Sequence, residues 1–136
     1  MNDQFNNTED FWQYQIESSA RNMYENMSPN LALFSSLDSI FVFCEQQNIE
    51  LVLFSPPTHI DLQIQPERWN IGDLKLQFHE DLSTIGCKYI NFDKPDTLTS
   101  NKSNFSDPFH LARYQSYILD CLLKKEDGRP STEKRG

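Results

Sequence analysis

Apolar residues near the start of the chain recur every three or four positions, the spacing that places them on one face of an α-helix. This pattern predicts a helix over residues 8 to 27. The acidic residues Glu9 and Asp10 fall in its first turn, where the helix dipole favours negative charge. We therefore expect the helix to bury an apolar stripe made of Trp12, Ile16, Ala20, Met23 and Met27.

A second helical pattern follows directly. Ser28 and Pro29 predict its start, because serine caps helix N-termini and proline suits the first helical position. Asn48 predicts its end, because asparagine tolerates the left-handed backbone that stops helices. The expected apolar stripe is Leu31, Phe34, Leu37, Phe41 and Cys44. We also expect a group of phenylalanines in the core, namely Phe41, Phe43, Phe54 and Phe78.

Two short apolar runs predict β-strands. Residues 49–54 (IELVLF) form the first, and the two prolines of Ser55-Pro56-Pro57 must end it because proline cannot continue a strand ladder. Residues 88–92 (KYINF) form the second. A third helix is expected between them, with the apolar positions Ile71, Leu74, Phe78, Leu82 and Ile85 and a stop at Gly86. A polar loop over 93–109 then leads to a last helix, marked by Leu111, Tyr114, Ile118 and Leu122.

Strands that alternate with helices predict right-handed crossovers and a parallel sheet, which makes the fold class α/β. Two strands form a very small sheet, so the chain resembles part of an α/β layer rather than a complete one. Its 136 residues suit one domain, which we place at residues 1–123. The charged tail over 124–136 is expected to be disordered.

The negative charge of the chain limits the classes of partner that it can bind. The formal net charge of −8 argues against nucleic acid and against an anionic membrane surface, both of which need basic patches. Without a signal peptide or an apolar run long enough to span a membrane, the chain as written is expected in the cytoplasm. A cell-envelope origin stays open if it derives from a longer protein. Three cysteines without a C-x-x-C pair favour buried thiols in a reducing compartment over a metal site.

Candidate chemistry lies where the two strands end. Ligands of open parallel sheets bind beyond the carboxyl ends of the strands, so His59, Asp107 and His110 are expected on one rim. A histidine beside a carboxylate is the arrangement of a general base. Asp107 could instead form only a cap or a turn before Pro108, and the two roles can coexist.

The other histidines have alternatives too. His59 is a candidate substrate-binding residue or else a surface histidine, and His79 is expected to be solvated beside Glu80 and Asp81. A metal site made of His59, Asp107 and His110 has a suitable ligand set but is disfavoured, so no metal and no cofactor is expected.

Asp107-Pro108-Phe109-His110-Leu111, directly before the last helix, resembles the D-x-x-H block of the SGNH (GDSL-type) hydrolases. The stretch NIELVLFSPPTH resembles the penultimate strand of that superfamily, most of all in members linked to acylation of cell-surface polysaccharides. The resemblance covers residues 30–123, the C-terminal half of such a domain. It implies a partial three-layer α/β/α, flavodoxin-like fold with a short parallel sheet. It also implies that His110 is the general base and that Asp107 orients it.

Two blocks of the family are missing from this sequence. No Gly-Asp-Ser tripeptide supplies a nucleophile, and the nearest string, Leu37-Asp38-Ser39, falls within the second predicted helix. The Gly-x-Asn-Asp block is absent as well, since no glycine stands in the matching position before Asn101 or Asn104. Because the nucleophile and the oxyanion donors carry much of the rate, we expect little or no hydrolysis by this chain alone.

The leading hypothesis is a truncated or split SGNH-like serine esterase or acyltransferase that acts on acylated carbohydrate. The rival is a non-catalytic α/β interaction module, and a third reading is a gene remnant. The open edge of the strand at 50–54 predicts a homo-oligomer or a partner chain that completes the sheet, because unpaired strand edges invite pairing. The alternative is that the first helix, with Trp12, Ile16 and Met23, covers this gap.

Overall fold

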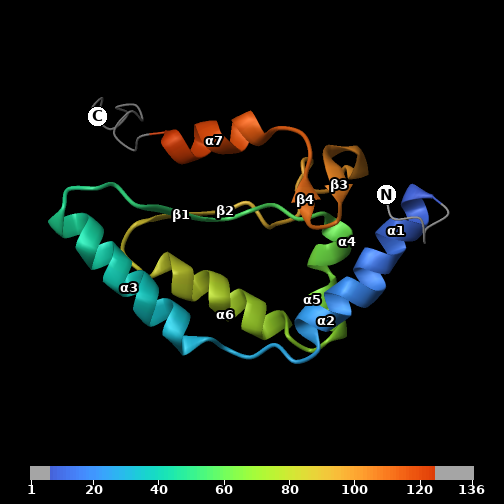
Figure 1. Ribbon diagram of the computed structural model, residues 1–136, viewed down its shortest axis with the longest axis horizontal. Coiled ribbons are helices and arrows are strands. Elements are labelled where there is room, and N and C mark those ends of the chain that lie inside the picture. Colours follow the sequence, from blue (N-terminus) through green and yellow to red (C-terminus); the bar gives the residue numbers. More distant parts are fainter. Residues whose placement is uncertain (1–6, 125–136) are drawn as a thin grey trace, which may run out of the picture.

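The computed structural model describes residues 7–124 and shows a mixed α/β arrangement (Figure 1). The central element is a parallel pair of strands, β1 (Val52–Ser55) and β2 (Lys88–Asn91). Val52 lies opposite Lys88, and the register continues to Ser55 opposite Asn91. A small antiparallel hairpin pairs β3 (Phe105–Asp107) with β4 (His110–Leu111). The predicted parallel pairing is therefore confirmed.

Helices lie on both sides of the parallel pair (Figure 1). Helix α7 (Gln115–Leu123) lies on one side, whereas α3 (Leu31–Gln46) and α6 (Gly72–Ser83) lie on the other. Two short helices that the sequence did not predict, α4 (Ile60–Gln63) and α5 (Gln65–Arg68), connect β1 to α6. The described residues contain no helix that is long and apolar enough to cross a membrane.

The N-terminal helix forms where it was predicted, but it ends earlier. It consists of α1 (Thr8–Tyr14), a π-helical segment η1 (Gln15–Ser19) and α2 (Ala20–Tyr24). The carboxamide of Asn7 caps it by accepting a hydrogen bond of 2.8 Å from the backbone N–H of Asp10. Of the predicted stripe, Trp12, Ile16 and Ala20 are buried, whereas Met23 and Met27 are exposed.

Helix α3 begins at Leu31, so the predicted start at Ser28 and Pro29 is wrong. The side chain of Asn30 accepts a hydrogen bond from the backbone N–H of Leu33 and provides the cap instead. Asparagine caps helices as well as serine does, which is why the competing signal could prevail. The predicted stop is confirmed, because Asn48 has a φ of 57° directly after the helix.

The turn between α6 and β2 requires a glycine. Gly86 has a φ of 112°, and a Cβ atom at this position would lie 2.9 Å from Cε1 of Phe41. The close approach lets α6 and α3 share one side of the sheet. Helix α6 itself ends at Ser83, a little before the predicted stop.

The predicted loop over 93–109 contains more structure than its composition suggests. A 3-10 turn, η2 (Lys102–Asn104), leads directly into β3. Leu111 belongs to β4 rather than to the last helix, and Tyr114, with a φ of 69°, precedes α7. The predicted tail lies outside the described residues from 125 onward.

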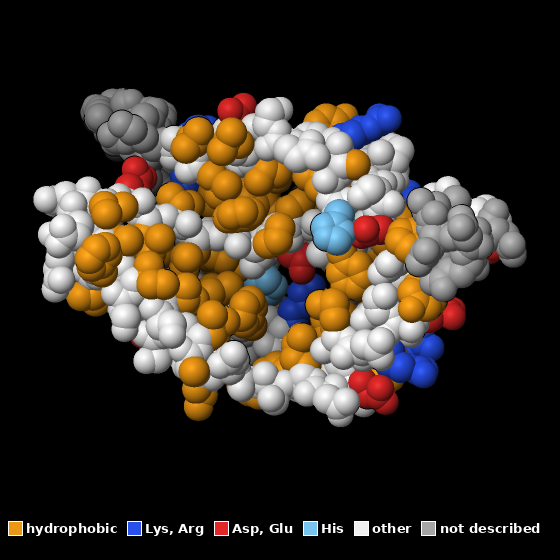
Figure 2. All heavy atoms as spheres, viewed as in Figure 1, with side chains coloured by type: hydrophobic (Ala, Val, Ile, Leu, Met, Phe, Trp, Pro, Cys, Tyr) orange, Lys and Arg blue, Asp and Glu red, His pale blue; other side chains and the backbone are white. Residues whose placement is uncertain are grey.

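One cluster of buried residues lies where α1 and α2 pack against α4 and the hairpin, and it consists of Trp12, Ile16, Ala20, Leu62 and Phe105. The other buried apolar residues lie along α3, α6, α7 and the segments that flank β2, namely Cys44, Ile71, Leu82, Ile85, Phe92 and Ile118. The phenylalanines that were expected in the core lie elsewhere. Phe43 is 58% exposed, Phe54 43% and Phe78 37%, and Phe41 is partly buried, so that prediction is wrong. Figure 2 shows hydrophobic side chains gathered on one face around α3, α7 and the strands.

Candidate functional site

Asp107 and His110 flank the turn of the β3–β4 hairpin and contact each other. The Nδ1 atom of His110 lies 2.8 Å from Oδ2 and 2.9 Å from Oδ1 of Asp107. An ionised carboxylate can only accept, so Nδ1 must carry the hydrogen and donate it. This bond fixes the tautomer of the imidazole and leaves Nε2 as the nitrogen with a lone pair. The predicted pair is therefore assembled, and its role remains a prediction.

The turn between the two residues also explains the alternative role of Asp107. Its Oδ1 accepts a hydrogen bond of 2.8 Å from the backbone N–H of Phe109, which forms an Asx-type turn. Pro108 is fully buried and fixes the backbone between them. Asp107 is therefore both a turn residue and the partner of His110, so the two readings coexist.

The two side chains differ in exposure. The His110 side chain is 73% exposed, whereas that of Asp107 is 18% exposed. The aspartate is held by the turn, and the imidazole projects into solvent. A group that approaches from outside can reach the ring without any rearrangement, which is what a general base requires.

His59 is buried, contrary to the alternative that it is a surface histidine. It is 4% exposed and caps α4, with its Nδ1 accepting a 3.0 Å hydrogen bond from the backbone N–H of Asp61. Its ring meets Trp12 edge-on at 4.9 Å between centroids and Phe105 at 5.5 Å. Contact with a substrate remains a prediction, and it requires side chains that cover the ring to move, since both Trp12 and Phe105 contact it.

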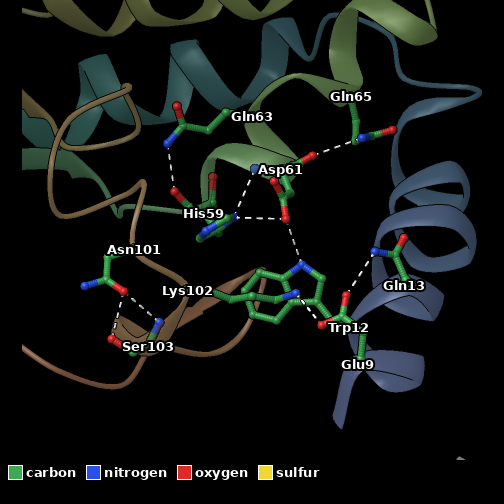
Figure 3. Close-up of polar contacts among 11 residues, drawn as sticks. Glu9, Trp12, Gln13, His59, Asp61, Gln63, Gln65, Asn101, Lys102 and Ser103 are labelled. Atoms are coloured by element: carbon green, nitrogen blue, oxygen red, sulfur yellow. Dashed lines mark hydrogen bonds and ion pairs between the residues drawn. The ribbon is translucent and has the colours of Figure 1, made fainter. Parts of the chain in front are cut away.

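A network of polar contacts holds Trp12 over His59 (Figure 3). The indole Nε1 of Trp12 donates to Oδ2 of Asp61 at 3.0 Å. The ammonium of Lys102 lies 4.4 Å from the centroid of the Trp12 ring and 2.7 Å from Oε2 of Glu9. We call this group of residues, Glu9, Trp12, His59, Asp61 and Lys102, the α1 latch. It connects α1 to α4 and to η2.

The electrostatics of the α1 latch follow from its burial. Burial lowers the pKa of His59, against a weaker opposite effect of the Asp61 carboxylate. The hydrogen bond from Lys102 lowers the pKa of Glu9. Near neutral pH, His59 is therefore uncharged, and its proton sits on Nε2 because Nδ1 is an acceptor.

The two rim segments meet through their backbones. The N–H of His59 donates to the carbonyl of Pro108 at 2.9 Å, and the N–H of Ile60 donates to the carbonyl of Thr99 at 3.0 Å. The segment after β1 thus supports the turn that carries Asp107 and His110. The expectation that these segments come together is confirmed at the level of the backbone.

A second polar cluster at the strand ends was not predicted. The hydroxyl of Tyr89 lies 2.8 Å from Oγ of Ser55 and 2.6 Å from Nδ1 of His79. The ammonium of Lys75 lies 2.8 Å from Oδ2 of Asp93, whose Oδ1 accepts from both the N–H and the hydroxyl of Thr58. We call Ser55, Lys75, His79, Tyr89 and Asp93 the strand-end cluster.

The prediction that His79 is solvated is therefore wrong. It is partly buried, and burial, with a smaller contribution from Lys75, lowers its pKa. The sequence did contain a signal for this cluster. Ser55 and Asp93 follow the two apolar runs, and Lys75 and His79 stand four positions apart, on one face of a helix.

The asparagines and the serine that were weighed for chemistry have structural contacts. Asn101 caps η2 through the N–H of Ser103, and Asn104 donates to the carbonyl of Leu98. The hydroxyl of Ser39 donates to the carbonyl of Ser35 within α3. Ser39 is thus on a helix and not at a strand-to-helix turn, as expected.

The cysteines are less uniform than predicted. Cys44 is buried, whereas Cys87 and Cys121 are only partly buried. Burial raises the pKa of the Cys87 thiol, which makes it a poor nucleophile near neutral pH. Among residues 7–124, no group of three or more histidine, cysteine, aspartate or glutamate side chains is placed to hold a metal ion.

Comparisons with protein-family models, with curated proteins and with solved structures found no match to this chain. The arguments on function therefore rest on the residues and on their geometry.

Proposed function

We propose that the chain supplies the base half of an SGNH-like serine esterase or acyltransferase site that acts on acylated carbohydrate. His110 is the general base in this proposal, and Asp107 orients it. The chain is inactive alone, because its residues lack the nucleophile and oxyanion blocks of that superfamily.

One observation carries the proposal. The carboxylate of a mostly buried aspartate receives the Nδ1 proton of a histidine whose ring is largely exposed, at 2.8 Å. A surface ion pair would leave both side chains mobile, whereas here the turn at Pro108 and Phe109 holds the acceptor. The arrangement leaves Nε2 ready to take a proton from a nucleophile outside this chain.

The position of the pair in the fold supports the same proposal. The parallel pair β1–β2, with α7 on one side and α3 and α6 on the other, is what the C-terminal half of a three-layer, flavodoxin-like α/β/α domain would provide. In this proposal a further strand belongs beside the free edge of β1. The serine would approach His110 from that side.

Ester hydrolysis tests the proposal in two steps. The isolated chain is expected to release no more nitrophenol from short-chain aryl esters than buffer does, and His110→Ala is expected to change nothing. Mixing it with the product of an adjacent reading frame that carries a Gly-Asp-Ser segment is expected to produce turnover. His110→Ala should abolish this turnover, and Asp107→Asn should reduce it.

Three results would contradict the proposed site or the role of His110 in it. Turnover by the isolated chain that survives His110→Ala would show that the site lies elsewhere. Turnover that is lost in Ser39→Ala would make the helical serine the nucleophile instead. Activity of the mixture that persists in His110→Ala would remove this residue from the chemistry.

A second candidate function, a non-catalytic α/β interaction module, is favoured by the exposed apolar face. Among the described residues no strand pairs with the second edge of β1. Phe54 on β1, Phe43 on α3 and Leu119 on α7 are all more than two-fifths exposed. We propose that a second copy or a partner chain covers this face. Sedimentation at micromolar concentration is expected to show self-association, and a monomer with slowly exchanging amides over 50–54 would contradict it.

A further inference from the structure

A cavity of about 380 Å³ lies beside the strand-end cluster and does not include Asp107 or His110 among its lining residues. Its walls come from the segment that follows α2, the first turn of α3, and α6. Apolar side chains form most of them, chiefly Leu33, Phe34, Ile71, Leu74 and Phe78. The volume falls within the range of about 300–1,000 Å³ that is typical of small-molecule sites.

One end of the cavity is polar. Ser55, Lys75, His79 and Asp93 line it there, together with Tyr24 from the end of α2. Ser55 is the last residue of β1, and Asp93 follows shortly after β2. The polar end therefore lies at the carboxyl ends of the parallel strands, where open α/β sheets bind their ligands.

The charged side chains at the polar end of the cavity determine which ligand charge it can accept. Lys75 is paired with Asp93 at 2.8 Å, and the other carboxylate oxygen of Asp93 is occupied by Thr58. Asp81 also lines the cavity, but it stands six residues after Lys75 on α6, where it accepts a hydrogen bond from Gln77 at 2.8 Å. At the polar end, a carboxylate ligand would face the Asp93 carboxylate and an ammonium that Asp93 already neutralises. A cationic ligand would have to displace Lys75.

The protonation of the neighbouring groups adds no net charge. Burial lowers the pKa of His79, so its ring is neutral at pH 7. Burial and the nearby Asp93 carboxylate raise the pKa of Tyr24 to about 12, so its hydroxyl stays protonated. The polar end thus offers hydroxyl groups and a closed ion pair, which suit an uncharged hydrogen-bonding group.

We propose that this cavity binds a small, uncharged amphipathic molecule, whose apolar body contacts α3 and α6 and whose polar group meets Ser55 and the Lys75–Asp93 pair. An aliphatic alcohol or a neutral ester has this chemistry. The inference does not depend on the proposed function, because it uses neither Asp107 nor His110.

The uncharged fluorophore N-phenyl-1-naphthylamine provides a direct test, since its emission rises in apolar pockets. We expect saturable binding to the full chain. Decan-1-ol should displace the probe at a concentration about tenfold lower than either decanoate or decylammonium, because burying an unpaired charge is costly. Displacement by decanoate at equal or lower concentration than decan-1-ol would overturn the assignment, as would the same result with decylammonium or the absence of saturable binding.

Two neighbouring leucines on α6 provide a matched control. Leu74 lines the cavity, whereas Leu76 is 65% exposed and does not. Leu74→Trp should fill the cavity and weaken probe binding by about tenfold, while Leu76→Trp should leave it unchanged. Leu33→Trp enters the cavity from α3 and tests the same point if Leu74→Trp does not fold. Unchanged binding in the folded cavity variants would show that the probe binds elsewhere and would overturn the proposal.

The dependence of probe binding on protein concentration tests whether a second copy of the chain occupies the cavity. If a second copy of the chain occupied the cavity, probe binding per chain would fall as the protein concentration rises. That result would assign the cavity to the interface between copies and would contradict a small-molecule site. Constant binding per chain across the concentration series is expected.

Discussion

Histidines in this chain have three different environments, and only one of them could be predicted from the sequence. The contact between Asp107 and His110 is local, since the two residues stand three positions apart in one turn. The burial of His59 depends on Trp12, which comes from a distant part of the chain. His79 depends on Tyr89 in the same way. The contact of His59 with Trp12 leaves no local pattern in the sequence, and the spacing of Lys75 and His79 showed a shared helix face but not that Tyr89 would contact it.

The buried His59 and the partly buried His79 predict how stability depends on pH. Burial lowers the pKa of both His59 and His79, so between their folded and unfolded pKa values the unfolded chain binds more protons. The free energy of unfolding should therefore be fully retained above the unfolded value of about 6.5 and fall as the pH drops below it. Thermal unfolding at pH 7.5 and at pH 5.5 measures this loss.

The variant His59→Asn separates this contribution from that of the carboxylates. Asparagine keeps a side-chain acceptor at the cap of α4 but does not titrate. The variant is expected to show a smaller loss of stability between pH 7.5 and pH 6 than the parent chain. An equal loss in both proteins would mean that His59 is not held in its neutral form by burial.

Elements with a clear apolar pattern were predicted well, and elements without one were not. The helices around Trp12 and Leu82 have an apolar spacing that extends over many residues, and the two parallel strands are short apolar runs, so all of them formed at about the expected places. The hairpin β3–β4 has strands of three and two residues, too short to show alternation. Helices α4 and α5 have four residues each and no amphipathic period.

Helix α1 is attached mainly through Trp12, which is 2% exposed. Replacing it by alanine removes the ring that covers His59 together with the hydrogen bond to Asp61, so Trp12→Ala should cost about 3–5 kcal/mol of unfolding free energy. The exposed neighbour Gln13 serves as the control, and Gln13→Ala should cost less than about 0.5 kcal/mol. Chemical denaturation of both variants measures the difference. Equal costs would contradict the role of the α1 latch.

The backbone of the turn before β2 predicts that replacing Gly86 lowers the stability of the chain. Gly86→Ala forces a side chain into a φ of 112° and against the Phe41 ring, and should cost about 1–3 kcal/mol. Gly72→Ala is the matched control, because the group it would meet is the flexible end of Glu67. Denaturation midpoints should therefore rank the parent first, Gly72→Ala next and Gly86→Ala last. The reverse order of the two variants would show that the approach of Phe41 is not restrictive.

At the scale of the whole molecule, a packed cluster around Trp12 lies at one end, and exposed apolar side chains gather around β1, α3 and α7. The sequence predicted an unpaired edge of β1 correctly, because in a sheet of two strands each strand has a partner on one side only. Among the described residues β1 pairs with β2 alone. The sequence predicted the phenylalanines wrongly, because apolar character alone does not show which side chains the other elements cover. The N-terminal helix does not cover this apolar face, since its buried residues pack against α4 and β3 instead.

The exposed face predicts a variant that alters association. Phe43 is 58% exposed on α3, and Phe43→Glu places a charge on the face that we expect to be covered. The dissociation constant for self-association, measured by sedimentation equilibrium, should rise by at least about tenfold, because an interface does not tolerate an unpaired buried charge. A dissociation constant that does not change would place the interface elsewhere.

Nitrogen-15 NMR of the histidine rings tests whether Asp107 orients His110 as a base. At a pH where the rings are neutral, we expect a proton on Nδ1 of His110 and on Nε2 of His59, because the first nitrogen donates to a carboxylate and His59 Nδ1 accepts from a backbone N–H. Asp107→Ala should shift His110 toward the Nε2 tautomer and leave His59 as it was. A His110 ring that already favours the Nε2 tautomer, or one that does not respond to Asp107→Ala, would show that Asp107 does not orient His110.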